Sequence, residues 1–292
     1  MRVLQRRASN RVDVWEHDRY LRLLTLSQGL ALVEVTNRGS VDEPDLRYSI
    51  LTGPRSLAAH TRIRQTTSRI LGLDVDPDPL QKLAEVDPAL RPIVLSLRGM
   101  RPPRFAELFE SFASVIPFQQ LSLDAGISIL GKLVERFGEH VVHRGIRYSA
   151  FPNSTVIAAA PLEHLQLCGL SLKKAQTLQQ IARLIDAGEL SEATVSAMDT
   201  NDALERLTQL PGVGPWTAGL VLLRGLGRTD VFPPGDAGAA RRLRTLLKLE
   251  DRAPIDAAVA RFGKRQGYLY FCCLGSSLLE KGSIRSALTV DS

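Results

Sequence analysis

The chain has 292 residues, 44% of them apolar, so it is long enough for two or three modules with cores of their own and is too apolar to be disordered. Lys and Arg exceed Asp and Glu by 37 to 31, and the pI of about 9.5 suits a polyanionic partner without requiring one. No apolar run is long enough for a membrane span, and no secretory signal follows the four Arg of the first eleven residues. We therefore expect a cytoplasmic protein with a disordered basic start.

Cysteine usage excludes one class of metal centre. Only three cysteines are present, Cys168, Cys272 and Cys273, and two of them are adjacent. A zinc or iron–sulfur centre held by four thiolates therefore cannot form. Reduced thiols are expected in a cytoplasmic protein.

Strand signals are concentrated near the N-terminus. The runs 20–27 and 30–36 flank a Gln-Gly pair, and a third run, 47–52, ends before Gly-Pro. The segment 55–71 then carries apolar residues at helical spacing. These signals predict strands and a helix in a first domain, residues 1–103.

From residue 104 onward, helical periodicity replaces the strand signals. A break at Gln119 and Gln120 opens a predicted helix that runs to Phe137. An earlier amphipathic helix, ending near Pro117, is predicted by apolar residues at spacings of three and four: Phe105, Leu108, Phe109 and Phe112. Residues 104–292 are therefore expected to form a helical region.

Within this region, two helical runs in residues 202–224 flank the segment 210–218, which reads LPGVGPWTA. Its two glycines allow a tight turn and a close approach of bare backbone amides to a large anion. Those amides lie at the start of the second run, where unpaired N–H groups and the helix dipole favour a phosphate. Pro215 suits the first helical position. The pattern predicts a helix-hairpin-helix, although by itself it is equally compatible with an ordinary corner between two helices.

A second motif follows the hairpin. The segment 230–236 reads DVFPPGD and ends on Asp236, directly before a helical run over 237–247. Asp236 is therefore a predicted N-cap, and a capping residue with no further role is the simplest interpretation. The helix dipole also favours its charged form, which suits an anion that stabilises nearby positive charge.

The hairpin, followed twenty residues after Trp216 by this Asp, resembles the helix-hairpin-helix DNA glycosylases. The resemblance runs from about residue 21 to 281 and is greatest to the monofunctional bacterial 3-methyladenine DNA glycosylase II type. It implies a mostly α fold with a small N-terminal α+β domain, an antiparallel sheet plus helices, and two helical modules around an active-site cleft. It also implies a monomer that acts on double-stranded DNA containing damaged bases. One branch of the family carries an iron–sulfur cluster, for which this chain lacks the ligands, so no cofactor is expected.

The resemblance implies that Asp236 is catalytic. Base release passes through an oxocarbenium-like sugar that a nearby anion stabilises, after the nucleotide has left the stack. An N3- or N7-alkylated purine is already cationic and leaves as a neutral base. Where bifunctional relatives carry a Schiff-base lysine, this chain has Trp216, so we expect an abasic product and no lyase activity.

The family's pattern also implies a DNA wedge and a base pocket. Gln120 takes the wedge position in a Gln-Gln-x-Ser-like turn, the alternative being a polar turn residue. The pocket is assigned to Trp216, Leu220, Ala237 and Leu274, with a core role as the alternative for the indole. Aliphatic walls give up stacking and cation–π attraction. We therefore expect a narrower substrate range than in broad-range relatives, favouring 3-methyladenine and 7-methylguanine.

The hairpin supplies the remaining implied contacts. DNA phosphate is expected to meet residues of the turn and the second helix: Gly212, Val213, Gly214 and Thr217. The carbonyls of Leu210 and Gly212 are candidates to hold Na⁺ or K⁺, with no metal bound by side chains. Two other functions stay open: a glycosylase for oxidised or deaminated bases, and a catalytically silent binder of damaged DNA. Retention of Asp236 argues against the silent binder, because binding alone does not need a carboxylate beside phosphate.

Overall fold

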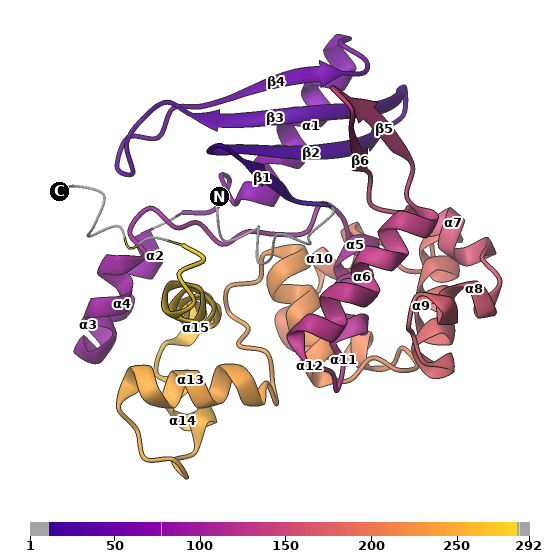
Figure 1. The fold of residues 1–292 in the computed structure, drawn as a ribbon. Coiled ribbons are helices and arrows are strands. Elements are labelled where there is room, and N and C mark those ends of the chain that lie inside the picture. The colour runs from indigo at the N-terminus through magenta and orange to yellow at the C-terminus, as the bar shows by residue number, and fades with distance from the viewer. Residues whose placement is uncertain (1–11, 77, 285, 287–292) are drawn as a thin grey trace.

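The computed structural model describes residues 12–76, 78–284 and 286, and the basic start expected within residues 1–11 lies outside the described residues. A small sheet lies against one side of a larger helical body (Figure 1). The expected fold class, mostly helical with a small N-terminal sheet domain, is confirmed.

The sheet has four antiparallel strands in the order β1-β2-β3-β4. The strands are β1 (Val14–Glu16), β2 (Arg19–Leu26), β3 (Gly29–Asn37) and β4 (Leu46–Thr52). The three predicted strands are confirmed to within one residue at each end. Strand β1 was not predicted, because three residues are too few to show an alternating pattern.

Both faces of the sheet are covered. On one face, Tyr20 and Leu24 of β2 pack with Ile63 and Ile70 of α1 (Leu57–Leu71), the predicted first helix. On the other face, Leu21 and its neighbours pack against a hairpin of β5 (His140–His143) and β6 (Ile146–Ser149). This hairpin lies in the region where the sequence predicted helices only. Its four-residue strands carry little pattern of their own, and it packs against β2 through Tyr148.

A buried ion cluster joins the sheet to the helical body. Arg22 of β2 is 4% exposed and donates to Asp13 at 2.7 Å and to Glu110 of α5 at 2.5 Å. Burial raises the pKa of Glu110, and the Arg22 charge opposes that rise. The cluster fixes α5 (Leu108–Ala113), whose continuation leads into the turn of the predicted wedge Gln120.

One helical module is built around Phe109 and Phe112 of α5. The predicted helix ending near Pro117 is shorter than expected: it covers only α5, and a 3-10 turn, η3 (Ile116–Phe118), replaces its last part. The module also contains α6 (Leu123–Phe137), α7 (Ser154–Ala159), α8 (Leu162–Leu167), α9 (Leu172–Asp186), α10 (Glu192–Ala197), α11 (Thr200–Thr208), α12 (Pro215–Leu220) and the π-helix η4 (Val221–Leu226).

The other helical module combines segments far apart in the chain. Leu83 and Leu90 share a core with Leu243 and Leu269. Figure 1 shows α3 and α4 beside α13 and α15. Its elements are α2 (Asp78–Gln81), α3 (Leu83–Val86), η2 (Pro88–Leu90), α4 (Arg91–Ser96), α13 (Ala237–Leu247), α14 (Ile255–Ala260), η5 (Gly263–Arg265) and α15 (Gln266–Glu280). Residues 80–97, assigned to the first domain from the sequence, thus pack with the C-terminal helices. Within the part of the chain that the structure describes, no helix is long and apolar enough to cross a membrane.

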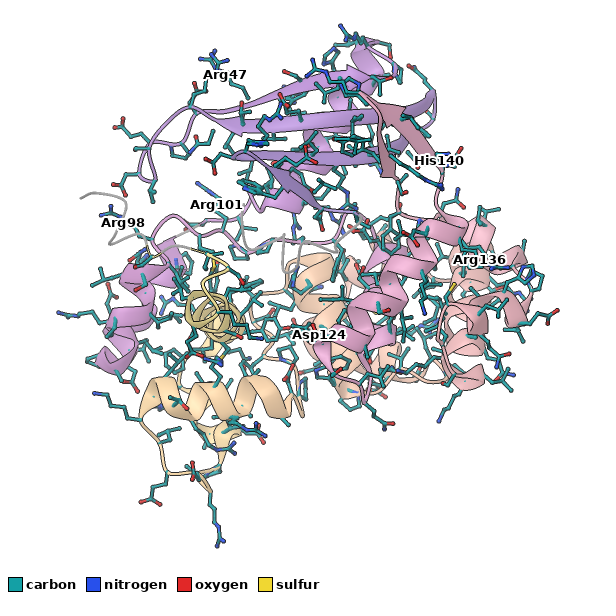
Figure 2. All side chains as sticks on the ribbon, in the orientation of Figure 1. Arg47, Arg98, Arg101, Asp124, Arg136 and His140 are labelled. Carbon is teal, nitrogen blue, oxygen red and sulfur yellow. The ribbon has the colours of Figure 1, made fainter. Side chains whose placement is uncertain are left out.

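The basic surplus is spread over several elements. Figure 2 shows Arg47 at the outer edge of the sheet and Arg136 on the far side of the helical body. Arg98 and Arg101 lie at another edge, beside the C-terminal module (Figure 2). Net charge alone therefore does not locate a binding face, and local geometry must do so.

Candidate active site and nucleic-acid interface

The predicted hairpin forms between α11 and α12. Pro215 begins α12, with Gly214 as its N-cap. Gly212 has a φ of +79°, and a Cβ there would lie 2.0 Å from Oγ1 of Thr177 on α9, so only glycine fits both the turn and its packing. At Gly214, by contrast, no described atom outside its own neighbourhood lies within 4 Å of the Cβ position. The backbone at Gly214 is therefore open to an approaching ligand.

The other hairpin residues can act only through their backbone. Val213 and Thr217 are 4% and 2% exposed, and the Thr217 hydroxyl accepts a hydrogen bond from Gln119 Nε2 at 3.0 Å. The carbonyl of Leu210 accepts from the Val213 amide at 3.0 Å, and that of Gly212 accepts from Gln119 Nε2 at 2.9 Å. Each carbonyl keeps a second lone pair, so both are compatible with a monovalent cation.

Asp236 is the N-cap of α13, as predicted. Its Oδ1 accepts a hydrogen bond from the Ala239 amide at 2.8 Å, and its Oδ2 accepts from the indole N–H of Trp216 at 2.9 Å. Trp216 in the first turn of α12 and Asp236 at the start of α13 are therefore in direct contact. Both side chains are half-buried, and the carboxylate retains lone pairs for a ligand.

A cavity of about 780 Å³ opens beside this pair. Four residues assigned from the sequence line it: Trp216, Leu220, Asp236 and Leu274. Its volume lies within the range of small-molecule pockets, roughly 300–1,000 Å³. An anion, an indole and apolar walls thus surround a space of the size a purine needs.

The cavity is more aromatic than the sequence suggested. Phe105, Phe118 and Tyr270 line it beside the expected Leu220 and Leu274, so the predicted aliphatic positions make up only part of its walls. These rings come from three separate segments, and the fold alone brings them together. Ala237 does not line the cavity: it is exposed and borders the two grooves on either side of the Asp236 turn, because the chain direction at the helix start turns it outward.

The wedge candidate Gln120 lies in the turn between η3 and α6. It is exposed and has a φ of +54°, a left-handed conformation that is uncommon for residues other than glycine. A groove of about 950 Å³ is lined by this turn, by the hairpin and by Asp236. The structure therefore places all three predicted DNA-contacting features along one groove.

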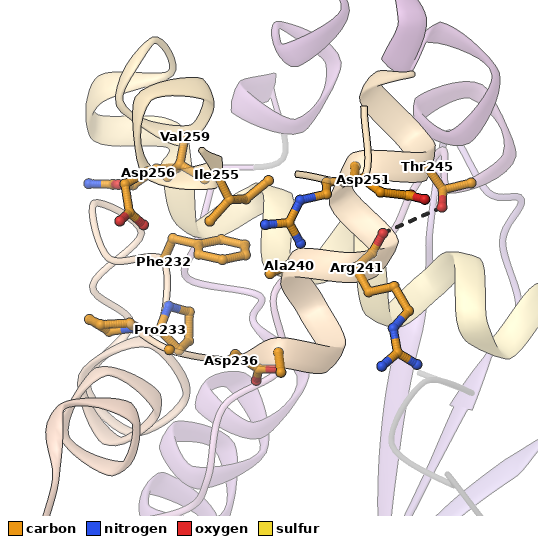
Figure 3. Close-up of a pocket in the computed structure, with 15 residues that line it drawn as sticks. Phe232, Pro233, Asp236, Ala240, Arg241, Thr245, Asp251, Ile255, Asp256 and Val259 are labelled. Carbon is orange, nitrogen blue, oxygen red and sulfur yellow. Dashed lines mark hydrogen bonds between the residues drawn. The ribbon is translucent and has the colours of Figure 1, made fainter. Parts of the chain in front are cut away.

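The three arginines of α13, Arg241, Arg242 and Arg244, differ in their contacts. Arg242 pairs with Glu280 at 2.6 Å, and Arg244 donates to the Ala253 carbonyl at 3.2 Å. Arg241 is exposed and lines a second groove of about 800 Å³, between α13 and α14, that also reaches Asp236. Figure 3 shows the Arg241 side chain extending away from the groove's apolar floor. Of the three, Arg241 is therefore the most accessible to an external anion.

The thiols offer no reactive or metal-binding group. Cys168, Cys272 and Cys273 are free and buried, and burial raises the pKa of Cys272 to about 12. No group of three or more His, Cys, Asp or Glu suited to a metal ion occurs among residues 12–76 and 78–284. The cysteines are therefore core residues.

Two family models match this chain. The model of the AlkA N-terminal domain matches residues 1–107, and that of the HhH-GPD superfamily base excision DNA repair protein matches residues 113–263. The chain belongs to the HhH-GPD superfamily. The superfamily match contains the turn of the predicted wedge Gln120, the hairpin and Asp236.

Individual relatives agree with this family. The chain is 32% identical over 184 residues to the DNA-3-methyladenine glycosylase of Bacillus subtilis, covering 63% of this chain but 61% of that protein. It is 27% identical over 233 residues to DNA-3-methyladenine glycosylase 2 of Escherichia coli, covering 80% of this chain and 78% of that one. The chain spans only 35% of a probable bifunctional transcriptional activator/DNA repair enzyme AlkA of Mycobacterium tuberculosis.

Solved structures share the fold. The 3-methyladenine DNA-glycosylase from Archaeoglobus fulgidus matches with a TM-score of 0.78 and 26% identity, over 94% of this chain and 91% of that one. The Clostridium acetobutylicum 8-oxoguanine glycosylase/lyase in complex with double-stranded DNA matches with a TM-score of 0.74 and 19% identity, over 94% and 90% of the two chains. The second likeness shows the fold alone.

Sequence reasoning missed several residues of this HhH-GPD site. Lys281 lines the cavity from the end of α15, and Arg224, 3% exposed, reaches it from η4. Gln119 was seen only as part of a turn, whereas its side chain bonds to the hairpin. Adjacent glutamines at a break were the one available signal. The other residues follow from tertiary packing.

Proposed function

We propose that this chain is a monofunctional DNA glycosylase that flips alkylated purines of the 3-methyladenine and 7-methylguanine type out of double-stranded DNA and excises them, leaving an abasic site. The observation that carries the proposal is the Asp236 carboxylate held by the Trp216 indole N–H at the edge of an aromatic cavity. The relatives named DNA-3-methyladenine glycosylase support the substrate class.

Asp236 acts on the sugar in this proposal. As the glycosidic bond breaks, positive charge develops on the deoxyribose, and a fixed carboxylate stabilises it without needing to reorganise. Two donors, the Ala239 amide and the Trp216 indole, hold the carboxylate in place. Orientation of the attacking water is its second role. The base leaves with its electron pair and, if alkylated at N3 or N7, departs neutral.

The cavity receives the flipped base. Trp216, Phe118 and Tyr270 line it with aromatic rings, which attract a cationic purine and also stack on a neutral one, whereas the Phe105 ring already packs against the Arg224 guanidinium. These additional rings weaken the structural reason for a narrow range. We propose that neutral adducts such as hypoxanthine are accepted as well, more slowly than the labile cationic bases.

Two elements grip the DNA in this proposal. The open backbone at Gly214 and the first-turn amides of α12 bind a phosphate, and Arg241 contacts the backbone in the groove on the other side of Asp236. Structural neighbours solved in complex with DNA support a DNA partner. We propose a monomer that uses no cofactor, with the Leu210 and Gly212 carbonyls as the place for a Na⁺ or K⁺ ion.

Lack of lyase activity is also proposed, because Trp216 offers no amine. One lysine, Lys281, lines the cavity, so a Schiff base through its amine is the specific alternative. The deciding experiment is single-turnover release of 3-methyladenine from alkylated duplex DNA. Release that leaves an intact abasic strand supports the proposal. Release of 8-oxoguanine or uracil alone would favour a glycosylase for oxidised or deaminated bases, and binding without release a silent binder.

A further inference from the structure

The backbone of the wedge turn is held in an uncommon conformation. Gln120 has a φ of +54° and is exposed, so its own side chain has no packing that would explain the conformation. Strained backbone of this kind persists only when surrounding contacts determine it. Those contacts come from α9 and from the hairpin.

Lys174 on α9 is the first of them. Its Nζ donates to the Pro117 carbonyl at 3.2 Å and to the Gln119 carbonyl at 2.7 Å, so a single ammonium group binds both sides of the turn. Partial burial lowers the pKa of Lys174. Because this half-buried ammonium group has two carbonyl acceptors, it acts as a structural link and not as a free cation.

Gln119 makes the second set of contacts that hold the turn. Its carboxamide Nε2 leaves the turn and donates to the Gly212 carbonyl at 2.9 Å and to the Thr217 hydroxyl at 3.0 Å. Both acceptors belong to the hairpin. One side chain thus ties the residue next to the wedge to the element that grips phosphate.

Helix α9 packs against both the turn and the hairpin. Thr177, three residues after Lys174, packs against Gly212 so closely that a Cβ would lie 2.0 Å from its Oγ1. The turn, the hairpin and α9 therefore form a closed triangle of contacts. A shift of the hairpin would therefore be transmitted to the turn through these contacts.

We propose that Lys174 and Gln119 are positioning residues that hold Gln120 in its left-handed conformation and couple its entry into the DNA stack to seating of the hairpin on phosphate. This rests on the proposed function, in which Gln120 is the wedge. In this arrangement neither residue touches DNA. They affect the rate at which the base is extruded from the duplex, and they change neither the rate of bond cleavage nor the affinity for undamaged duplex DNA.

The test compares Lys174→Met and Gln119→Glu with two matched controls on exposed surfaces, Lys132→Met on α6 and Gln180→Glu on α9. Gln119→Glu keeps the shape, removes the donor and adds a negative charge, and Gln180→Glu carries the same change of charge outside the groove. Single-turnover excision is measured on a base-paired lesion and on the same lesion in an unpaired bubble, together with the Kd for undamaged duplex. Thermal unfolding checks each variant, and Gln119→Glu carries the test if Lys174→Met does not fold.

We expect at least a tenfold slower excision of the paired lesion by Lys174→Met and Gln119→Glu, and a change of less than threefold for the bubble lesion and for the duplex Kd. The controls should match the parent protein. If Lys174→Met instead weakens duplex binding and lowers its salt dependence, Lys174 is a phosphate contact and the inference fails. Equal slowing on paired and bubble lesions also overturns it, because that result indicates a general structural role.

A double variant separates this inference from the wedge assignment. Lys174→Met combined with Gln120→Ala should be no slower than Gln120→Ala alone, since both act through one step. If Gln120→Ala excises the paired lesion normally, the wedge role itself is wrong. If Gln120→Ala is slow but Lys174→Met and Gln119→Glu are not, only the coupling is wrong.

Discussion

Replacement of Asp236 by Asn removes one negative charge and little else. The amide oxygen can still accept the Ala239 N–H that caps α13, and Asn is as good an N-cap as Asp. The amide NH₂ then faces the Trp216 indole N–H, donor against donor, where the carboxylate accepted at 2.9 Å. We expect this to lower the free energy of unfolding by only about 1 kcal/mol.

The effect on catalysis should be much larger. A carboxylate about 4 Å from a unit positive charge, at an effective dielectric constant of about 20, stabilises it by about 4 kcal/mol. Loss of that stabilisation in the transition state corresponds to a roughly 1,000-fold slower reaction. DNA affinity should stay equal or rise slightly, because a negative charge beside phosphate has been removed.

The assay is single-turnover excision of 3-methyladenine, with Kd for a damaged duplex measured by fluorescence anisotropy. Asp202→Asn is the matched control, since Asp202 is an exposed carboxylate in the first turn of α11 and lines neither the cavity nor the two grooves. Excision by Asp236→Asn within tenfold of the parent rate would refute the assignment of Asp236 as the charge-stabilising group. Loss of DNA binding would instead indicate that the carboxylate organises the site.

Four further outcomes follow from the site. Borohydride should trap no covalent adduct with damaged DNA; if an adduct forms and disappears in Lys281→Gln, the enzyme is a lyase through that residue, which lines the cavity. Gly214→Val should weaken binding to damaged and undamaged duplexes about equally with little loss of stability, because its Cβ meets open space. Gly212→Val should also destabilise the fold, because its side chain clashes with Thr177. Selective loss of damaged-DNA binding by Gly214→Val would instead mean that the hairpin is part of the base pocket. Arg241→Gln should reduce the slope of log Kd against log salt concentration by about 0.9, as expected for one lost phosphate contact. The control is Arg252→Gln, in an exposed loop; if both variants keep the parent slope, Arg241 does not contact DNA. Tyr270→Leu should slow hypoxanthine excision by about 3- to 10-fold, the loss of one stacking ring, and 3-methyladenine excision by less because that bond is labile; the opposite order would contradict the proposed base pocket.

Local chemistry allowed much of the fold to be predicted from the sequence. The strands 20–27 and 30–36 were indicated by two β-like runs on either side of a Gln-Gly pair, and the helix boundaries at Pro215 and Asp236 were indicated by their turn and capping residues. Each of these signals depends on residues within about four positions of one another, where backbone geometry leaves few alternatives. The hairpin β5–β6 was missed because its strands are short and its packing partner, β2, precedes it by more than a hundred residues.

For the site, the sequence by itself determined which residue types are present: an Asp at a helix start, a Trp in place of a lysine, and paired glycines. Tertiary structure alone decided how they meet. The indole N–H bonds to the carboxylate, Gln119 reaches the hairpin, and Phe105 and Tyr270 make the cavity aromatic. Periodicity indicates which face of a helix is buried but not which side chain lies opposite, since that depends on how distant segments pack.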